Sequence, residues 1–278
     1  MEVDQDAQHA HTARRGLMEC VVPQRTKDGV MLKVVLTELE QNLDLAYRSR
    51  VQKHFNMDVQ GFMGVPTPVV RKIAASTLKD IKPAPFSDVL VLCEELLKTG
   101  VYECKIIAFD LVFRRRRSLE VHHFSVLERW LYTYVNDWTD CDDLCTHALG
   151  FLIAENPSLA ESSLRWTRSG NRWVRRGSAV SLIYGLRRGF LLDAALQSAE
   201  RLLKDSDPLV QKGYGWMLKE ASKCCPERVF DFVMKSRWEM PRTSLRYAIE
   251  KLPEGQRQEA LAKSEQQGHP LEASTSRN

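Results

Sequence analysis

The sequence has 278 residues, 44% of them hydrophobic and 27% charged, with a formal net charge of +4. This is the composition of an ordinary globular chain, long enough for one large core or for an array of repeats. No run of about 18 apolar residues occurs and the first residues contain no apolar signal core, so we expect neither membrane spanning nor secretion. Seven cysteines without framework spacing indicate a reduced, cytoplasmic chain.

Helical spacing dominates the chain between two polar stretches. Residues 1–27 and 253–278 are polar and aperiodic, and we expect both to be tails, the second with room for a short helix. Over residues 28–252, apolar residues recur at steps of three and four, as in LKVVLTELEQNLDLAYRSRV and VYECKIIAFDLVF. Prolines and glycines punctuate the pattern, and no segment has convincing β-strand spacing. The sequence therefore predicts an all-α fold.

Five segments of the central region align with one another, and a less regular sixth follows them. Their first residues are Pro66, Tyr102, Trp138, Trp173, Leu209 and, for the sixth, Pro241. The first four intervals are 36, 36, 35 and 36 residues. Such a period, filled by two helices, is typical of an α-solenoid, in which each helix pair buries its apolar face against its neighbours. Because the tetratricopeptide signature is absent, we expect HEAT-like repeats, curved around a basic concave groove.

The alignment places one carboxylate at an unusual position. Residues at offsets 0, +3, +4 and +7 from each start share one helix face. At offset +4, Asp142 stands where the other segments carry apolar or small residues, namely Val70, Ile106, Gly177 and Gly213. An unpaired carboxylate in a packed seam costs several kcal/mol, so Asp142 is either neutralised locally or faces a polar groove.

Cations and glycines near this offset favour the groove. Three segments carry a cation at offset +3, namely Lys105, Arg176 and Lys212. The bare backbone at Gly177 and Gly213 would let a bulky, charged ligand approach the helices closely. The other aspartates nearby, Asp137, Asp140 and Asp143, are expected on a solvated face or at a helix cap.

Basic residues concentrate in the second half of the chain. From Leu159 to Arg188 there are seven arginines against one acid, Glu161, and an RRRR block stands at 114–117. Trp166 and Trp173 are interleaved with these arginines. Basic residues mixed with aromatics on helices suggest a polyanionic partner, most plausibly nucleic acid. The alternative is that long basic side chains merely coat the surface of a solenoid.

Four motifs resemble the DNA alkylation repair family built on HEAT-like repeats, the AlkD-like DNA glycosylases. They are FMGVPTPVVRKIA (62–74), WTDCDD (138–143), NRWVRRGSAV (171–180) and VQKGYGWMLKEA (210–221). The resemblance implies a clasp around duplex DNA and hydrolysis of the N-glycosidic bond of N3- and N7-alkylated purines. It implies Asp142 as the catalytic residue, four residues after Trp138, with Arg176 as a groove cation and Trp216 as a second aromatic wall.

These four residues have offsets +4, 0, +3 and +7, so the repeat register independently puts them on corresponding helix faces. We expect Arg176 to hold a phosphate and to keep the pKa of Asp142 low. Lys105, Arg175 and Lys212 complete the expected DNA contacts. The family commonly has an acid directly after the first Trp, whereas this chain has Thr139, which leaves Asp140 and Asp143 open as substitutes for Asp142.

Two other classes of function remain open. Some relatives lack the catalytic acid and only bind DNA, so a non-catalytic scaffold for damaged or branched DNA is one alternative. A protein-interaction solenoid is another. Cys141, Cys145 and His147 have no second ligand pair, so we expect no metal, and the motifs of nucleotide cofactors are absent. We expect a monomer of bacterial type that associates with the nucleoid when acting on DNA.

Overall fold

The computed structural model describes residues 28–55 and 61–262, which form helices joined by short loops and contain no strand. The all-α prediction is therefore confirmed. The N-terminal stretch that the sequence predicts as a tail, 1–27, lies outside the described residues. Within the predicted C-terminal tail, 253–278, helix α17 (Glu254–Leu261) is a short helix of the kind for which the sequence leaves room, and its Ala260 is buried. Only residues 263–278 of that stretch lie outside the described part of the chain.

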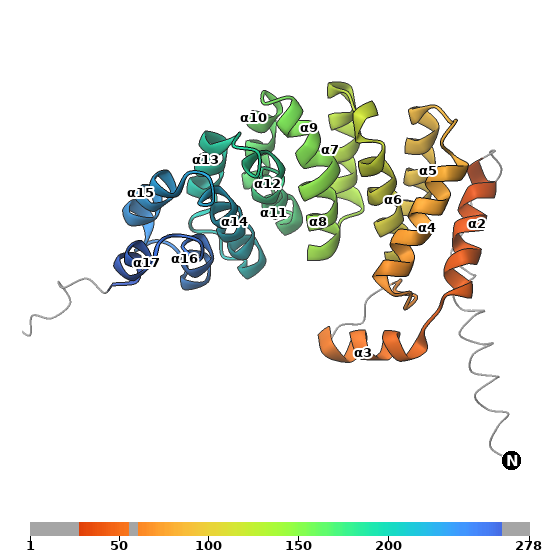
Figure 1. The fold of residues 1–278 in the computed structure, drawn as a ribbon, viewed down its shortest axis with the longest axis horizontal. Helices are drawn as coiled ribbons and strands as arrows, with labels where there is room; N and C mark the ends of the chain where they lie inside the picture. The colour runs from red at the N-terminus through yellow and green to blue at the C-terminus, as the bar shows by residue number, and fades with distance from the viewer. Residues whose placement is uncertain (1–27, 56–60, 263–278) are drawn as a thin grey trace, which may run out of the picture.

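The helices alternate between two layers of a curved stack (Figure 1). The inner layer consists of α4 (Thr67–Asp80), α6 (Tyr102–Arg114), α8 (Trp138–Leu144), α11 (Arg172–Val180), α14 (Pro208–Ala221) and α16 (Arg242–Ala248). The outer layer consists of α5 (Phe86–Lys98), α7 (Phe124–Thr133), α10 (Leu159–Leu164) with the 3₁₀ turn η4 (Arg165–Arg168), α13 (Leu192–Leu202) and α15 (Pro226–Ser236). Successive inner helices contact one another, so the chain forms the solenoid that the period predicts.

Each inner helix begins within one residue of the start that the sequence alignment gives. Local chemistry sets these boundaries. Asp137 precedes α8 and accepts a hydrogen bond from the Asp140 amide at 2.9 Å, while Asn171 does the same for the Trp173 amide ahead of α11. Asp207 precedes α14, whose first residue is Pro208, a residue that loses no hydrogen bond at a helix start.

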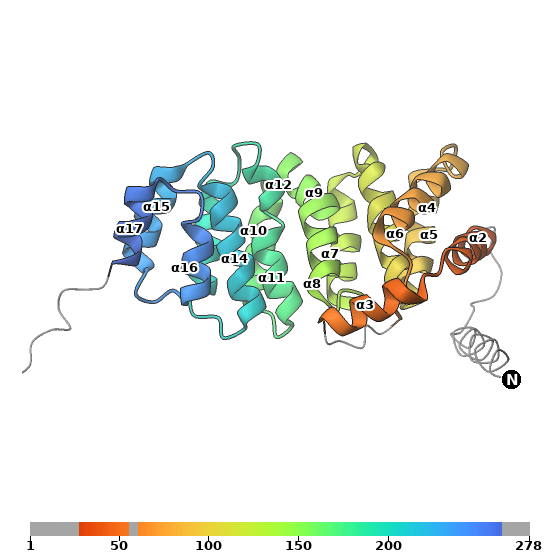
Figure 2. The same ribbon diagram turned by 60° about the horizontal axis from the view of Figure 1, so that its bottom comes forward.

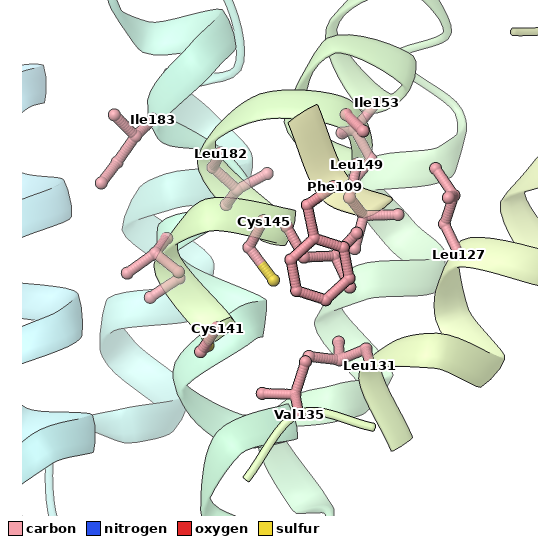
Figure 3. Packing of buried hydrophobic residues seen from close by; sticks show 14 of the residues in the cluster. Phe109, Leu127, Leu131, Val135, Cys141, Cys145, Leu149, Ile153, Leu182 and Ile183 are labelled. Atoms are coloured by element: carbon pink, nitrogen blue, oxygen red, sulfur yellow. The ribbon is translucent and has the colours of Figure 1, made fainter. Parts of the chain in front are cut away.

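The third inner helix does not continue as a regular α-helix. After α8, residues Cys145–Leu149 (η3) form one π-helical turn, and α9 (Gly150–Glu155) continues beyond it. The fourth inner helix is likewise followed by a short second piece, α12 (Ile183–Leu186). Buried apolar side chains from both layers pack around the π turn, including Phe109, Leu131 and Cys145 (Figure 3). This packed core fixes the face of α8 that carries Asp142.

Two helices precede the repeats. Helix α2 (Asp28–Gln41) packs against α4 and α5, burying Leu39 completely. Helix α3 (Leu45–Phe55) runs across the open side of the arch, at the edge where α8 begins (Figures 1 and 2). Two 3₁₀ turns, η1 (Arg116–Ser118) and η2 (Val121–His123), join α6 to α7.

Candidate active site

A cleft of about 370 Å³ opens on the inner layer, between α4, α6, α8 and α14. Helix α8 contributes Trp138, Asp142 and Asp143 to its wall, and α14 contributes Trp216. Trp138, Asp142 and Trp216 thus line one cleft, although as many as 78 residues separate them in the sequence. The indole of Trp138 is 38% exposed, so its face is accessible from the cleft.

Arg176 is the direct partner of Asp142. Its Nε donates to Oδ1 and its Nη2 to Oδ2 of Asp142, both at 2.8 Å, while Nη1 donates to the carbonyl oxygen of Leu209. The guanidinium is buried, whereas the carboxylate of Asp142 remains 19% exposed. Because a carboxylate oxygen accepts more than one hydrogen bond, the bidentate pair leaves acceptor capacity on the side of Asp142 that faces the cleft.

The ionisation of Asp142 reflects two opposing influences. Burial raises the pKa of Asp142 above the ordinary carboxyl value, and the hydrogen bonds and charge of Arg176 oppose that rise. Burial is the larger influence, so the expectation of a low pKa for Asp142 is wrong. The register predicts a cation beside Asp142, but how far Asp142 is removed from water depends on the packing of the helices, which the register does not specify.

Asp140 also borders the cleft, but its carboxylate is buried in an ion pair with Lys105. Lys105 Nζ lies 2.7 Å from Asp140 Oδ2 and 2.8 Å from Asn136 Oδ1, and both charged side chains are at most 5% exposed. Burial raises the pKa of Asp140 to about 7, with a further increase from Asp137. In this position Lys105 holds α6 against α8 rather than facing a ligand. The geometry therefore argues against Lys105 as a DNA contact and against Asp140 as a substitute for Asp142.

Asp143 belongs to a third charged group at the cleft. Arg71 Nη2 donates to both carboxylate oxygens of Asp143 at 2.9 Å, and Arg71 Nη1 lies 3.3 Å from Asp110 Oδ1. His147 Nδ1 lies 3.3 Å from Asp143 Oδ1, and the hydrogen bond and charge of Asp143 raise the pKa of His147. Asp143 thus has the Arg71 guanidinium and the His147 imidazole as neighbours. Arg71 carries no sequence signal of its own, although the residue lies inside the first of the four motifs.

The second tryptophan is oriented by a charged network of its own. Trp216 Nε1 donates to Glu220 Oε1 at 3.2 Å, and the other oxygen of Glu220 accepts from Arg187 at 2.9 Å and Lys223 at 2.8 Å. Although burial favours a higher pKa, these two cations hold the pKa of Glu220 at about 2, so this carboxylate is ionised throughout the physiological range.

Thr139, where the family commonly has an acid, accepts a hydrogen bond from the Tyr102 hydroxyl at 3.1 Å.

Protein side chains fill the space beside two glycines that the sequence suggested as approach points for a ligand. A Cβ added at Gly213 would lie 3.1 Å from Cγ of Arg176, and one at Gly177 would lie 3.0 Å from a methyl group of Leu131. Gly213 therefore makes room for the Arg176 side chain. The inference that these positions admit a ligand is wrong, because both glycines serve helix packing.

Carboxylates neutralise much of the basic stretch between Leu159 and Arg188. Four of its seven arginines are ion-paired: Arg172 with Asp207, Arg175 with Asp205, Arg176 with Asp142 and Arg187 with Glu220. Arg175 also donates to the carbonyl oxygens of Ser169 and Gly170, so it braces a loop. Lys212 is exposed on α14.

The two tryptophans of this stretch differ in their surroundings. Trp166 is 1% exposed, stacks on Phe124 and donates to Glu128, so it is a core residue and not a stacking surface. Trp173 is half-buried, with the guanidinium carbon of Arg172 5.1 Å from its ring.

Within residues 28–55 and 61–262, no group of three or more His, Cys, Asp or Glu side chains is arranged to hold a metal ion. Cys141 and Cys145 are buried free thiols, and burial raises the pKa of Cys141. None of the helices in the same part of the chain is long and apolar enough to cross a membrane.

The fold and the cleft together define an α-solenoid protein with a candidate active site on its inner layer. The family model described as DNA alkylation repair enzyme matches residues 35–252, and the chain belongs to this family. A solved structure described as a predicted DNA alkylation repair enzyme from Enterococcus faecalis is 15% identical, with a TM-score of 0.69 over 77% of this chain and 98% of that one. At this identity the likeness shows the shared fold alone. No curated protein matches the sequence.

Membership of this family supports a role in DNA repair, with DNA as the substrate. The family description also indicates that the repair is enzymatic. The interpretation of the chain as a protein-interaction solenoid is correspondingly less favoured.

Proposed function

We propose that the protein is a DNA glycosylase that hydrolyses the N-glycosidic bond of N3- or N7-alkylated purines in duplex DNA, with Asp142 as the catalytic residue. One observation carries the proposal: in a chain of the DNA alkylation repair family, the carboxylate of Asp142 lines a cleft whose wall also includes the indoles of Trp138 and Trp216. The same three positions follow from the repeat register and from the four motifs.

The chemistry requires little beyond one placed carboxylate. An N3- or N7-alkylated purine already carries a positive charge, so it departs without a general acid. The sugar then develops the character of an oxocarbenium cation, which an ionised Asp142 stabilises by Coulomb attraction in a site partly removed from water. The oxygens of Asp142 keep acceptor capacity on the cleft side, which suits them to orient the water that attacks the sugar.

Trp138 and Trp216 account for selection of the charged lesion. The face of an indole attracts a cation, and one such contact contributes about 0.5–2 kcal/mol. The two indoles therefore favour a nucleotide with a cationic base, or a developing cationic sugar, over a neutral one. Glu220 keeps Trp216 in a fixed orientation through the indole N–H, so the ring is arranged before the substrate arrives.

Mass spectrometry of the bases released from methylated duplex DNA tests the proposal. The wild-type protein should release 7-methylguanine or 3-methyladenine without added metal. Asp142→Asn should slow release by orders of magnitude while DNA binding survives. Asp143→Asn is the matched control, since it removes the neighbouring charge on the same helix. If Asp143→Asn abolishes release and Asp142→Asn does not, the catalytic role belongs to Asp143.

A second function deserves the same experiment because Arg176 engages both oxygens of Asp142. If this pair stays closed on DNA, Asp142 serves to hold α8 and α11 together, and the protein is a non-catalytic DNA-binding scaffold. That function requires salt-sensitive binding of damaged or branched DNA with no base released from any alkylated substrate. Release of an alkylated base by the wild-type protein excludes it.

A further inference from the structure

A cluster of aromatic rings lies next to the cleft, at the ends of the inner helices. Phe113 is at the end of α6, Phe151 is in α9 and Tyr184 is in α12. The ring of Tyr184 contacts both phenylalanines edge-on, with centroids 6.3 Å from Phe113 and 5.7 Å from Phe151. Phe113 also contacts the ring of His147, which lines the cleft, at 4.7 Å. The cluster is therefore continuous with the candidate active site.

Two arginines lie on these rings. The guanidinium carbon of Arg116 is 4.7 Å from the centroid of Phe113 and 6.0 Å from that of Phe151. The guanidinium carbon of Arg188 is 3.6 Å from the centroid of Tyr184. Each arginine donates one further hydrogen bond, Arg116 to the carbonyl oxygen of Phe113 at 3.2 Å and Arg188 to that of Tyr184 at 2.9 Å. Ring faces and carbonyl groups thus fix both guanidiniums.

Neither arginine has a carboxylate partner among the described residues, in contrast to Arg71, Arg176 and Arg187 around the cleft. A ring face and a carbonyl oxygen carry no net charge, so the positive charges of Arg116 and Arg188 are not neutralised. Each guanidinium has five N–H donors, of which the structure accounts for one. Planar guanidiniums held in this way are suited to phosphate oxygens.

The positions of these arginines also have a purely structural interpretation. Helix C-termini carry partial negative charge, so cations are stabilised there, and Arg116 and Arg188 follow the ends of α6 and α12. That interpretation accounts for each arginine separately. It does not account for both lying on contacting rings at the edge of a cleft in a protein whose family acts on DNA.

We propose that Arg116 and Arg188 form a phosphate-binding site, separate from Asp142, which holds the sugar-phosphate backbone of duplex DNA beside the cleft. The site lies on the edge of the stack formed by α9 and α12, opposite the edge that α3 crosses (Figure 2). This phosphate site deepens the proposed function. It rests on that function, because only the proposed function identifies the ligand as DNA. The contacts position the duplex and read no base, so they act equally on damaged and undamaged DNA.

The test is the salt dependence of binding to an undamaged duplex, measured by fluorescence anisotropy over a series of NaCl concentrations. Each phosphate contact contributes about 0.9 to the slope of log K against log salt concentration. The double variant Arg116→Gln/Arg188→Gln should therefore lose about 1.8 from the slope and bind more weakly at every salt concentration. Arg116→Lys/Arg188→Lys keeps both charges and should keep most of the slope.

The matched control is Arg165→Gln/Arg168→Gln, which removes two exposed arginines of η4 in the outer layer and the same total charge. This control should leave the slope within about 0.5 of the wild-type value. Because Arg116 and Arg188 hold the duplex, base release by the double variant should slow at sub-saturating protein in proportion to its weaker DNA binding. The single variants give the same answer if the double variant folds poorly.

The outcomes separate the two proposals. If the double variant has the same slope as the wild type, or if the η4 control lowers the slope by as much, the phosphate site is overturned. The glycosylase proposal stands in either case. A wild-type protein that shows no salt-dependent binding to DNA overturns both. Release of alkylated bases with an unaltered slope in the double variant means that Arg116 and Arg188 only cap their helices.

Discussion

Arg176 of α11 binds both carboxylate oxygens of Asp142 of α8, each at 2.8 Å, and it is anchored in turn by the carbonyl oxygen of Leu209 at the start of α14. Three successive inner helices therefore meet at the residue to which we assign catalysis. Burial favours the neutral form of Asp142 and Arg176 favours the ionised form. The proposed chemistry needs the ionised form, so the arginine should control the pH range of activity.

We expect the rate of base release to fall as the pH decreases through the pKa of Asp142, which burial holds above the ordinary carboxyl value. Arg176→Gln removes the influence that opposes burial, so the pKa of Asp142 should rise and the acidic limb of the pH–rate profile should move to higher pH. Arg176→Lys keeps a charge and should move the limb less. Single-turnover rates between about pH 4 and pH 8 measure both shifts.

The salt dependence of DNA binding provides the control for this prediction. Arg176 is buried and already paired, so Arg176→Gln should leave the slope of log K against log salt concentration unchanged. A slope reduced by about 0.9 with an unmoved pH–rate profile would mean that Arg176 contacts a phosphate, as the sequence suggested, and does not tune Asp142.

Lys105→Met should destabilise the protein and leave DNA binding intact. The substitution leaves Asp140 buried without its cation, and breaking a buried ion pair costs about 3–5 kcal/mol in the free energy of unfolding. Urea denaturation measures this loss. A variant of normal stability whose DNA binding shows a lower salt slope would restore Lys105 to the DNA contacts expected from the sequence.

The pH dependence of stability follows from the same pair. The pKa of Asp140 is raised to about 7 in the folded state, above the ordinary value of 3.8. The fold therefore disfavours the ionised form, and this group's contribution to stability is lost as the pH rises from the ordinary value through about 7. Lys105→Met should steepen that loss, whereas Asp140→Asn should remove it. An Asp140→Asn variant that loses as much stability as the wild type when the pH rises from about 4 to about 7 contradicts this assignment.

The layer architecture was predictable because it depends on periodicity. Three- and four-residue apolar spacing, together with starts fixed by Pro66, Asp137 and Pro208, locates the inner helices to within one residue. The common face of Asp142, Trp138 and Trp216 follows from the same register. The register does not predict which side chains from other helices form hydrogen bonds or ion pairs with these residues, because such contacts depend on how closely the helices pack.

The charged residues illustrate that limit. Lys105 and Arg176 occupy the same offset, yet one pairs with Asp140 inside the stack and the other with Asp142 at the cleft. Trp166 stands among arginines in the sequence and among core residues in the fold. Arg71 and Glu220 gave no sequence signal of their own, because their importance lies in the side chains that they hold. Only the RRRR block indicated Arg116, and it did not indicate the rings beneath.

Glu220→Ala should weaken the reaction through Trp216, which loses the acceptor for its indole N–H. We expect base release to slow by about 3- to 10-fold, a loss of about 1 kcal/mol of transition-state stabilisation. Glu220→Gln keeps an acceptor for the indole and should retain more activity. A rate equal to that of the wild type in Glu220→Ala would show that Trp216 needs no such support.

The stability of Glu220→Gln should depend less on pH at the acidic end than that of the wild type. Arg187 and Lys223 hold the pKa of Glu220 at about 2, below the ordinary value of 4.5. Such a carboxylate contributes stability above its ordinary pKa, and this contribution is lost as the pH falls from about 4.5 towards 2. Thermal unfolding of the wild type and of Glu220→Gln at a series of pH values across this range measures the difference. If the unfolding temperatures of both proteins fall equally with pH, the prediction is wrong.

Gly213→Ala should lower activity by displacing Arg176. The added methyl group would lie 3.1 Å from Cγ and 3.3 Å from Nη1 of Arg176, so the side chain must shift by a few tenths of an ångström. A bidentate pair tolerates such a shift poorly, because both hydrogen bonds share one plane. We expect base release to slow about tenfold, or about 1.4 kcal/mol, with the acidic limb moved to higher pH. Gly170→Ala is the control, since its added methyl group meets nothing within 4 Å. If Gly213→Ala and Gly170→Ala have the same pH–rate profile, the exact position of Arg176 does not govern Asp142, and the carboxylate acts without its partner.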